Sequence, residues 1–340
     1  MRKWLAIMLA AVMLIVAGCS KNAEQAKPSD TSGAEVQQGG DKAYDPKDHP
    51  LAIVMILKGH PVHNIVQIGF LEKAKELGYP AEILAGDDAN SANAIAMGEA
   101  GILKGVRGML VWAHEQSFFP FIKKASDSQI KVVVPHFPVA EGEAPGLDVN
   151  LTADPYKYGQ DAAKAIAEKV GGKGTVAITQ GSFNILENKA AEGFKKMMYD
   201  NYPDIKVLAP IEEGFDPAIA VGKAVGIIQS NNDLVGAFST TGGGAATWAG
   251  AKDQTRKSDL ICIGMDYTEQ NIDLVKSGKI YGIVAQPLYE EAQESVVILD
   301  KLLRGEQLPY FKPLEAPVVT AEGIDKYAEI IMKVKEYFKK

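Results

Sequence analysis

From Leu51 onward, short apolar runs rich in Val and Ile alternate with amphipathic stretches that have the periodicity of helices. The first apolar run, LAIVMIL, leads into NIVQIGFLEKAKELG, in which Ile65, Ile68 and Leu71 recur at helical spacing. Continuous apolar strands that alternate with helices are typical of parallel sheets covered on both faces. The sequence therefore predicts an α/β protein built from doubly wound parallel sheets.

Length, charge and cysteine content narrow the possibilities further. The 340 residues are too many for one small core and favour about two domains. A net charge of −7 argues against a nucleic-acid-binding surface, which needs a basic face. The two cysteines, Cys19 and Cys262, are too few for a disulfide framework or a four-thiolate zinc site. Cys262 lies in the apolar run LICIGM, which predicts a buried core residue.

The N-terminus has the features of an export signal. A basic start, MRK, precedes an apolar run that is shorter than the roughly 20 residues of a membrane-spanning helix. The run ends in VAGC, and small residues directly before Cys19 resemble the lipobox of bacterial lipoproteins. That resemblance implies a signal peptide over residues 1–18 and a diacylglycerol on the Cys19 thiol. A plain secretory signal that happens to contain a cysteine is the alternative.

Residues 19–49 form a polar segment between this signal and the first apolar run. They are rich in Lys, Ser, Gly, Gln and Asp and show no apolar periodicity. Such a composition cannot bury a core and predicts a flexible tether. We therefore expect a protein that is exported and anchored at the extracytoplasmic face of a membrane.

The loops that follow the predicted strands carry most of the residues suited to ligand binding. In open α/β sheets, ligands bind beyond the carboxyl ends of the strands. In the first half of the chain, four of the five histidines fall at such ends, together with two aromatic residues. These strand-end residues are His60, His63, Trp112, His114, His136 and Phe137.

In the second half, the strand-end loops carry polar groups and one aromatic ring. The residues are Ser182, Asn184, Phe215, Thr241, Asp266 and Gln286, with Asn188 close behind them. Aromatic faces can stack on a small ligand while a few aimed polar groups select its hydroxyls. The glycine-rich TTGGGAATW predicts a tight turn in preference to a phosphate-binding loop.

From Leu51 to the C-terminus, the chain resembles the periplasmic sugar-binding proteins of ABC transporters, of the ribose- and galactose-binding type. The most specific parts of this resemblance are GMD, which ends at Asp266, the SGKI stretch after the next helix, and AQP, which contains Gln286. The resemblance implies that Asp266 and Gln286 form hydrogen bonds with sugar hydroxyls. It also implies a periplasmic binding protein fold of type I, delivery of the ligand to permease subunits, and a monomer.

The first half departs from that family at its binding loops. His60 stands where the family usually has Asn, and His63 replaces an aromatic residue. His136 and Phe137 replace the usual Asp-Arg pair, and Trp112 stands where a polar residue is common. A neutral imidazole can donate from one nitrogen and accept on the other, so it still suits hydroxyls. When protonated, it would also suit a carboxylate or a phosphate.

The same resemblance implies two lobes joined by three chain crossings, near residues 152–155, 285–287 and 313–317. The N-terminal lobe is expected to comprise residues 50–153 and 287–313, and the C-terminal lobe residues 154–286 and 314–340. The ligand would bind between the lobes, and hinge closure would bury it.

Parts of the sequence are also compatible with other functions. His60, His63, His114 and His136, with Glu115, would be enough ligands for a zinc site. A ligand-sensing partner of a chemoreceptor or sensor kinase would use the same binding mechanism. An enzyme is disfavoured, because the sequence has neither a GxSxG elbow nor a GxxxxGK[ST] loop. A transcriptional regulator would begin with a helix-turn-helix and not with a lipoprotein signal.

The preferred hypothesis is a lipid-anchored solute-binding protein of an ABC transporter, which captures a sugar, a polyol or a related small polar metabolite. It predicts no cofactor, no metal and no enzymatic activity. The predicted ligand-binding residues are His60, His63, Trp112, His136, Phe137, Asn188, Phe215, Thr241, Asp266 and Gln286.

Overall fold

The computed structural model describes residues 44–88 and 90–339. These residues belong to one compact unit that begins at Tyr44. The predicted signal peptide, the predicted lipidation site at Cys19 and most of the predicted tether lie outside the described residues.

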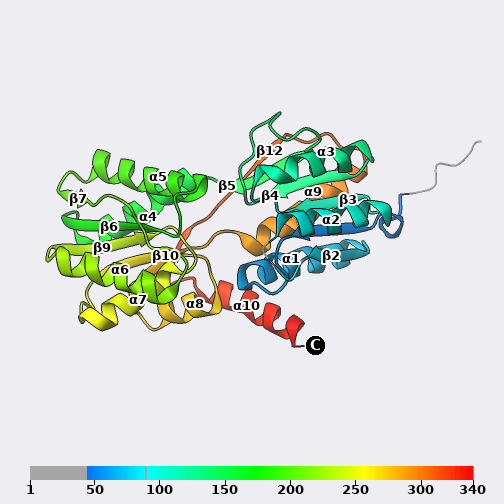
Figure 1. Ribbon diagram of the computed structural model, residues 1–340. Coiled ribbons are helices and arrows are strands. Elements are labelled where there is room, and N and C mark those ends of the chain that lie inside the picture. The colour runs from blue at the N-terminus through cyan, green and yellow to red at the C-terminus, as the bar shows by residue number, and fades with distance from the viewer. Residues whose placement is uncertain (1–43, 89, 340) are drawn as a thin grey trace, which may run out of the picture. The chain divides into compact units, whose positions relative to one another are not determined.

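Two separate sheets organise the described residues (Figure 1). The first has the strand order β12–β5–β4–β3–β1–β2, and all of its pairings are parallel. The second has the order β13–β11–β10–β9–β6–β7, with β8 beside β6, and only the β11–β13 pairing among them is antiparallel. The prediction of two α/β domains with parallel sheets is therefore confirmed.

The strands of the first sheet are β1 (Leu51–Met55), β2 (Ala81–Ala85), β3 (Gly108–Val111), β4 (Lys131–Pro135), β5 (Val149–Ala153) and β12 (Phe311–Leu314). Those of the second are β6 (Gly174–Gln180), β7 (Ile205–Val207), β8 (Ile211–Glu212), β9 (Leu234–Ser239), β10 (Ile261–Met265), β11 (Gly282–Val284) and β13 (Val318–Thr320). The helices are η1 (Pro46–Asp48), α1 (Pro61–Leu77), α2 (Ser91–Leu103), η2 (Gln116–Phe118), α3 (Phe119–Asp127), α4 (Pro155–Val170), α5 (Ile185–Asn201), α6 (Pro217–Ser230), α7 (Gly244–Thr255), α8 (Glu269–Lys276), α9 (Leu288–Leu303) and α10 (Asp325–Phe338).

The chain passes between the two sheets three times. It leaves the first sheet after β5, returns to it through α9 and β12, and crosses again before β13. Helix α9 packs on α1 and on β3, β4 and β5. We call β1–β5, α1–α3, α9 and β12 the first lobe, and α4–α8, β6–β11 and β13 the second lobe. The exact residues at which we expect each lobe to begin and end stay a prediction.

Close helix packing in each lobe depends on glycines. In the second lobe, a Cβ atom on Gly159 of α4 would lie 2.0 Å from the Ala190 carbonyl oxygen of α5. A Cβ on Gly193 of α5 would lie equally close, 2.0 Å, to the Tyr156 carbonyl oxygen of α4. The two backbones therefore approach to a distance that only glycine permits. Helix α5 follows the strand-end loop after β6, and Asn184 caps its start.

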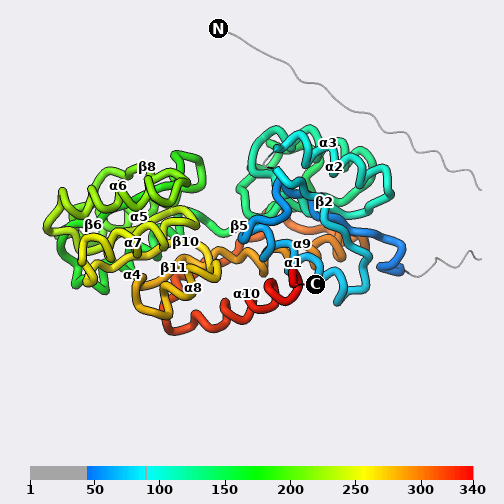
Figure 2. The backbone as a smooth tube through the Cα atoms, turned by 60° about the horizontal axis from the view of Figure 1, so that its bottom comes forward, coloured from blue at the N-terminus to red at the C-terminus, as the bar shows by residue number. Residues whose placement is uncertain are grey.

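Both ends of the described chain contact the folded body. Tyr44 donates to or accepts from the hydroxyl of Tyr79 at 2.6 Å, and the Arg304 guanidinium lies 4.4 Å from the Tyr44 ring centre. Tyr44, which the sequence assigns to the tether, therefore packs against the folded body. At the other end, α10 contacts both α8 and α1 (Figure 2).

Within the described ranges, no helix has the length and apolar character needed to cross a membrane.

Candidate functional site

His136 and Asp266 occupy the same place in the two lobes. His136 directly follows β4 and Asp266 directly follows β10, and these strands hold equivalent positions in the two strand orders. Both residues have left-handed backbones, with φ of 70° and 64°. Non-glycine residues rarely adopt this conformation, and such strain is concentrated at functional sites. Both strand ends therefore hold a polar side chain in a costly, fixed position.

Side chains of neighbouring elements donate hydrogen bonds to the backbone carbonyls of these two strained turns. At the first, the Thr152 hydroxyl donates to the His136 carbonyl at 2.6 Å. At the second, the side-chain amide of Asn271 donates to the carbonyls of Met265, at 2.9 Å, and Asp266, at 3.1 Å. Each turn thus has a polar side chain from a neighbouring element holding its carbonyl in place.

The aromatic and imidazole rings of the first lobe form one cluster. The rings of Trp112 and His136 stack with their centres 4.6 Å apart and their planes 20° apart. Phe137 presents an edge to Trp112 at 5.6 Å, and His63 does so at 5.9 Å. His60 lies 5.0 Å from His63. The structure thus brings together five of the residues that the sequence singled out.

The two histidines of the first loop differ in their surroundings. His63 is buried, and its Nδ1 lies 2.9 Å from the Leu57 carbonyl oxygen, so Nδ1 carries the hydrogen. Burial lowers the pKa of His63 to about 4, which outweighs the opposing effect of the Leu57 hydrogen bond. His60 is exposed at the start of α1, and partial burial of its ring lowers its pKa as well. Both imidazoles are therefore neutral near pH 7.

His136 has a partner that sequence reasoning missed, Glu291 of α9. Its Nδ1 lies 3.1 Å from Oε1 of Glu291, which is only 1% exposed. Burial alone would lower the pKa of His136, but the adjacent Glu291 carboxylate outweighs burial and raises it. In the sequence, Glu291 is one of two successive glutamates on an amphipathic helix, and nothing there marks it as buried.

Asp266 supplies a buried carboxylate at the equivalent strand end of the second lobe. Its side chain is 7% exposed, and Oδ1 has no hydrogen-bond partner among the described residues. Burial raises the pKa of Asp266 to about 6, with His136 lowering it and Glu291 and Glu187 raising it. Gly242 lies close to the other oxygen, because a Cβ there would be 2.8 Å from Oδ2. A buried acceptor without a donor points to a group that the ligand supplies.

Phe215 and Thr241 meet at Gly181, the residue after β6. A Cβ on Gly181 would lie 2.6 Å from Cε1 of Phe215 and 2.8 Å from Oγ1 of Thr241. Phe215 is 73% exposed, and Thr241 is half-buried. These two predicted residues therefore flank one loop of the second lobe, with a largely exposed ring available for contact.

A buried glutamate that the sequence did not reveal organises this loop. Oε2 of Glu187 accepts from the Gly181 backbone at 2.6 Å and from the Thr240 hydroxyl at 2.8 Å. Its Oε1 accepts from the Asn184 side-chain amide at 2.8 Å. Burial raises the pKa of Glu187, while these hydrogen bonds oppose the rise. Glu187 thus connects the loops after β6 and β9, and both of its carboxylate oxygens accept hydrogen bonds from other residues of the protein.

A pocket of about 630 Å³ lies between residues of the two lobes, among the loops that follow β3, β4 and β6. Of the predicted ligand-binding residues, Phe137 and Asn188 line it. The Asn188 side chain accepts from Gln180 at 3.0 Å and donates to the Phe183 carbonyl at 3.1 Å. Gln286 lies apart from this pocket, half-buried between β11 and α9.

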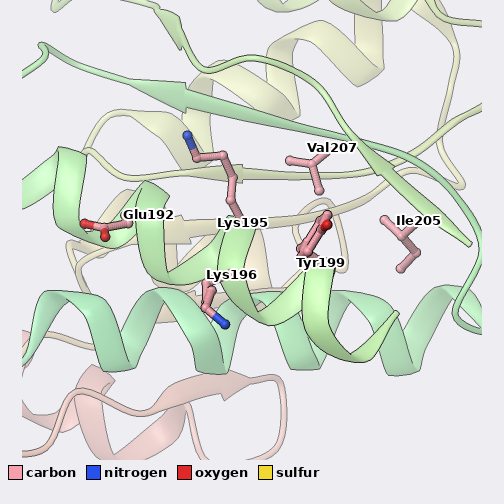
Figure 3. Close-up of a pocket in the computed structure, with 6 residues that line it drawn as sticks. All are labelled: Glu192, Lys195, Lys196, Tyr199, Ile205 and Val207. Carbon is pink, nitrogen blue, oxygen red and sulfur yellow. The ribbon is translucent and has the colours of Figure 1, made fainter. Parts of the chain in front are cut away.

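A further pocket, of about 440 Å³, lies between α5 and β7 (Figure 3). Its lining combines Tyr199 with Ile205 and Val207 on one side and charged residues of α5 on the other. In Figure 3 the side chains of Lys195 and Lys196 point in different directions. Lys196 forms an ion pair with Asp200 of the same helix. The polar groups of this pocket do not converge, so it is a poorer candidate than the strand-end site.

Metal binding has little geometric support. Within residues 44–88 and 90–339, no group of three or more His, Cys, Asp or Glu side chains is placed to hold a metal ion. The four histidines considered for zinc instead contact aromatic rings or other groups. His114 presents its ring to Phe118 at 5.4 Å and lies 3.4 Å from the Ser91 hydroxyl, while His136 contacts Trp112 and Glu291.

Comparison with known proteins gives a consistent picture. A family model described as periplasmic binding protein domain matches residues 51–307. The ribose import binding protein RbsB of Haemophilus influenzae is 25% identical, over 79% of this chain and 91% of that protein. The D-apiose import binding protein of Actinobacillus succinogenes is 24% identical, over 75% and 82%. The xylitol-binding protein of Mycolicibacterium smegmatis is 25% identical over 58% of this chain, and the match spans only 56% of that protein.

Solved structures share the fold. The arabinose-binding protein AraP from Geobacillus stearothermophilus superposes with a TM-score of 0.76 at 22% identity, over 82% of this chain and 99% of that one. A solute-binding protein from Actinobacillus succinogenes with bound D-allose gives a TM-score of 0.75 at 22% identity, over 82% and 100%. At this level of identity the similarity concerns the fold alone.

Proposed function

The chain belongs to the periplasmic binding protein family, and from that premise we propose that it is the extracytoplasmic solute-binding protein of an ABC transporter. Its ligand is a sugar, a polyol or a closely related polyhydroxylated metabolite. The ligand binds between the two lobes, closure of the lobes about the three crossings buries it, and the closed form delivers it to the permease subunits. The protein binds and releases its ligand without chemical change, so it is not an enzyme.

The observation that carries this proposal is the pairing of Asp266 with the ring cluster of the first lobe. Asp266 offers a buried carboxylate oxygen that has no donor among the described residues. The ring faces and edges of Trp112, His136 and Phe137 contribute apolar surface. A sugar or polyol has both properties that such a site needs, namely hydroxyl donors and an apolar carbon skeleton.

We propose the following roles for the candidate residues. Asp266 and Gln286 accept and donate hydrogen bonds with ligand hydroxyls, and Trp112 and Phe137 stack on the ligand. His60, His63 and His136 supply further hydrogen bonds from the first lobe. The rim of the site in the second lobe consists of Asn188, Phe215 and Thr241.

The names of three relatives support this ligand class. They mention ribose, D-apiose and xylitol, which are all small, neutral and polyhydroxylated. By the same reasoning from family and sequence, we propose that the mature protein begins at a lipidated Cys19. It would then be a monomer held at the outer face of the cell membrane, without a nucleic-acid partner.

A thermal-shift screen in EDTA tests the proposal. The panel contains pentoses, hexoses, alditols, cyclitols and sugar acids, with zinc in separate wells without EDTA. A compound at about a hundred times its dissociation constant stabilises a protein by roughly 2.7 kcal/mol, which is several degrees in Tm. We expect such a shift from a neutral sugar or polyol, and expect Asp266→Ala to abolish it. A shift with zinc alone would contradict the proposal and favour a metal site.

A further inference from the structure

We propose that Glu291 is a positioning residue of the ligand site, which holds His136 as an imidazolium whose Nε2–H group is free to donate to the ligand. This inference rests on the proposed function, because it assigns His136 a role in ligand binding. The contact that carries it joins two residues of the first lobe, His136 and Glu291.

The cost of burying Glu291 is the first argument. Its side chain is 1% exposed, and only Oε1 has a partner, the Nδ1 of His136 at 3.1 Å. Oε2 has no hydrogen-bond partner among the described residues. A buried carboxylate with one partner is expensive and contributes little net stability. Its presence on α9 is better explained by what it does to His136.

The second argument is the hydrogen position on the imidazole. Burial raises the pKa of Glu291, and the adjacent His136 opposes that rise. When Glu291 is ionised its oxygen accepts, so Nδ1 of His136 carries a hydrogen, and the other ring nitrogen, Nε2, is left for another partner. Within the described part of the chain, the His136 side chain forms its one hydrogen bond through Nδ1, so Nε2 is without a partner there, and the side chain is 12% exposed. One face of the ring rests on Trp112, whose indole favours a cation at stacking distance. The pair therefore leaves one ring nitrogen available to a ligand.

The charged groups around His136 come from three elements. Glu291 lies on α9, Asp266 follows β10, and His63 lies on α1. Both carboxylates favour the protonated ring, whereas His63 is neutral near pH 7. Among the described residues, none of the ion pairs of Glu291 or Asp266 involves a Lys or Arg side chain. Among the residues that the structure describes, His136 is thus the basic group that lowers the pKa of both carboxylates.

The consequence for recognition is a donor and an acceptor that face the ligand from equivalent strand ends. The imidazolium Nε2–H is the donor of the first lobe, and the Asp266 carboxylate is the acceptor of the second. A polyhydroxylated ligand can satisfy both, because each hydroxyl donates and accepts. Since Glu291 already compensates the charge of His136, the site gains a charged donor without attracting anions.

The experiment is an NMR titration of the full chain labelled with ¹⁵N-histidine. Two-bond ¹H–¹⁵N spectra distinguish an imidazolium from the two neutral tautomers, and His136→Asn assigns the signals of His136. In wild type we expect the imidazolium pattern for His136 at pH 7. In Glu291→Gln, which keeps an acceptor and removes the charge, deprotonation should shift to lower pH by about 1–3 units, the usual effect of a nearby opposite charge.

A matched control is available on the same helix. Glu290 hydrogen-bonds the Tyr267 hydroxyl at 3.2 Å and pairs with Lys326 at 3.3 Å. Glu290→Gln makes the same chemical change next to Glu291, and it should leave the His136 titration in place. A neutral His136 in wild type at pH 7, or an unchanged titration in Glu291→Gln, would overturn the inference.

The pH dependence of ligand affinity is a second measurement, because a purely structural role of Glu291 would not produce the change expected here. For any panel compound that binds wild type, Glu291→Gln should weaken binding about tenfold at pH 7, because a charged donor becomes neutral. Asp266, with a pKa of about 6, titrates in the same range in both proteins, so the measured quantity is the ratio of the two affinities. This ratio should approach one as the pH is lowered and His136 of the variant regains its proton. Equal affinities of wild type and Glu291→Gln at every pH would also overturn the inference. If no panel compound binds wild type, the proposed function fails, and the NMR titration still decides the state of His136.

Discussion

The two lobes place His136 and Asp266 at equivalent strand ends, with the same left-handed backbone and opposite chemistry. In the first lobe, the strand end is surrounded by rings, and the carboxylate of Glu291 from the same lobe lies 3.1 Å from the His136 imidazole. In the second lobe, Asp266 forms no ion pair with a described Lys or Arg side chain of its own lobe, and burial raises its pKa. The comparison teaches that the parallel-sheet scaffold fixes where a ligand contact stands, while the neighbouring elements determine its charge.

The largest effect should come from removing the ring on which His136 rests. Trp112 is buried, and its replacement by Ala deletes the stack with His136 and the edge contacts with Phe137 and His63. Large-to-small changes of a buried Trp typically cost about 3–5 kcal/mol of unfolding free energy. Urea denaturation followed by circular dichroism measures it.

Phe215→Ala is the matched control in the second lobe. Its ring is largely exposed, so the loss should stay within about 0.5 kcal/mol. Comparable losses for Trp112→Ala and Phe215→Ala would mean that the ring cluster of the first lobe is not a packed unit.

Asp266→Asn should stabilise the protein at neutral pH. The folded pKa of about 6 lies above the unfolded value of 3.8, so the folded state binds the proton more tightly. The contribution of Asp266 to stability is therefore most favourable at low pH and declines as the pH rises from about 4 to about 6. At pH 7 the penalty amounts to about 3 kcal/mol, which the neutral amide removes. Denaturation curves at pH 7 and pH 4 should show a gain at pH 7 that disappears at pH 4. A variant less stable than wild type at pH 7 would contradict this account.

His63→Asn probes the opposite pH dependence in the first lobe. The folded pKa of about 4 lies below the ordinary value of 6.5, so protonation opposes folding, and stability is lost as the pH falls between these values. At pH 5 this loss amounts to about 2 kcal/mol in wild type. An asparagine amide can still donate to the Leu57 carbonyl but does not titrate. The variant should keep its stability between pH 7 and pH 5 better than wild type does, and an equal loss in both proteins would refute the assignment.

Much of the fold and part of the candidate site could be predicted from the sequence. The alternation of apolar runs and helical periods is local information, and it was sufficient for two parallel-sheet lobes. Because carboxyl ends of parallel strands meet at one edge, residues as distant in sequence as His63, Trp112 and His136 could be expected to gather there, and the structure places them together. Their role in ligand binding stays a prediction.

Other parts of the site depended on information that a sequence pattern does not contain. Glu290 and Glu291 are adjacent and identical in type, yet one is half-exposed and the other is fully buried against His136. Only the rotation of α9 on the first sheet distinguishes them. Glu187 is a similar case, because its partners Gly181 and Thr240 belong to loops after two different strands. The strained backbones of His136 and Asp266 likewise arise from tertiary packing, since neither residue type requires a left-handed conformation.

The smallest effects are expected where α10 connects to both lobes. Lys333 lies 3.9 Å from Glu72 on α1, and Lys335 lies 2.6 Å from Glu269 on α8, with all four side chains substantially exposed. Exposed ion pairs usually contribute about 0–1 kcal/mol and weaken with salt. Lys333→Ala and Lys335→Ala should therefore each change the unfolding free energy by less than about 1 kcal/mol, and 1 M NaCl should reduce the difference further. A larger, salt-resistant loss in Lys333→Ala alone would show that the contact of α10 with the first lobe is a structural joint and not a surface pairing. The comparison of the two lobes would then have to include α10, because α10 would hold the first lobe to the C-terminal end of the chain as firmly as the three chain crossings do.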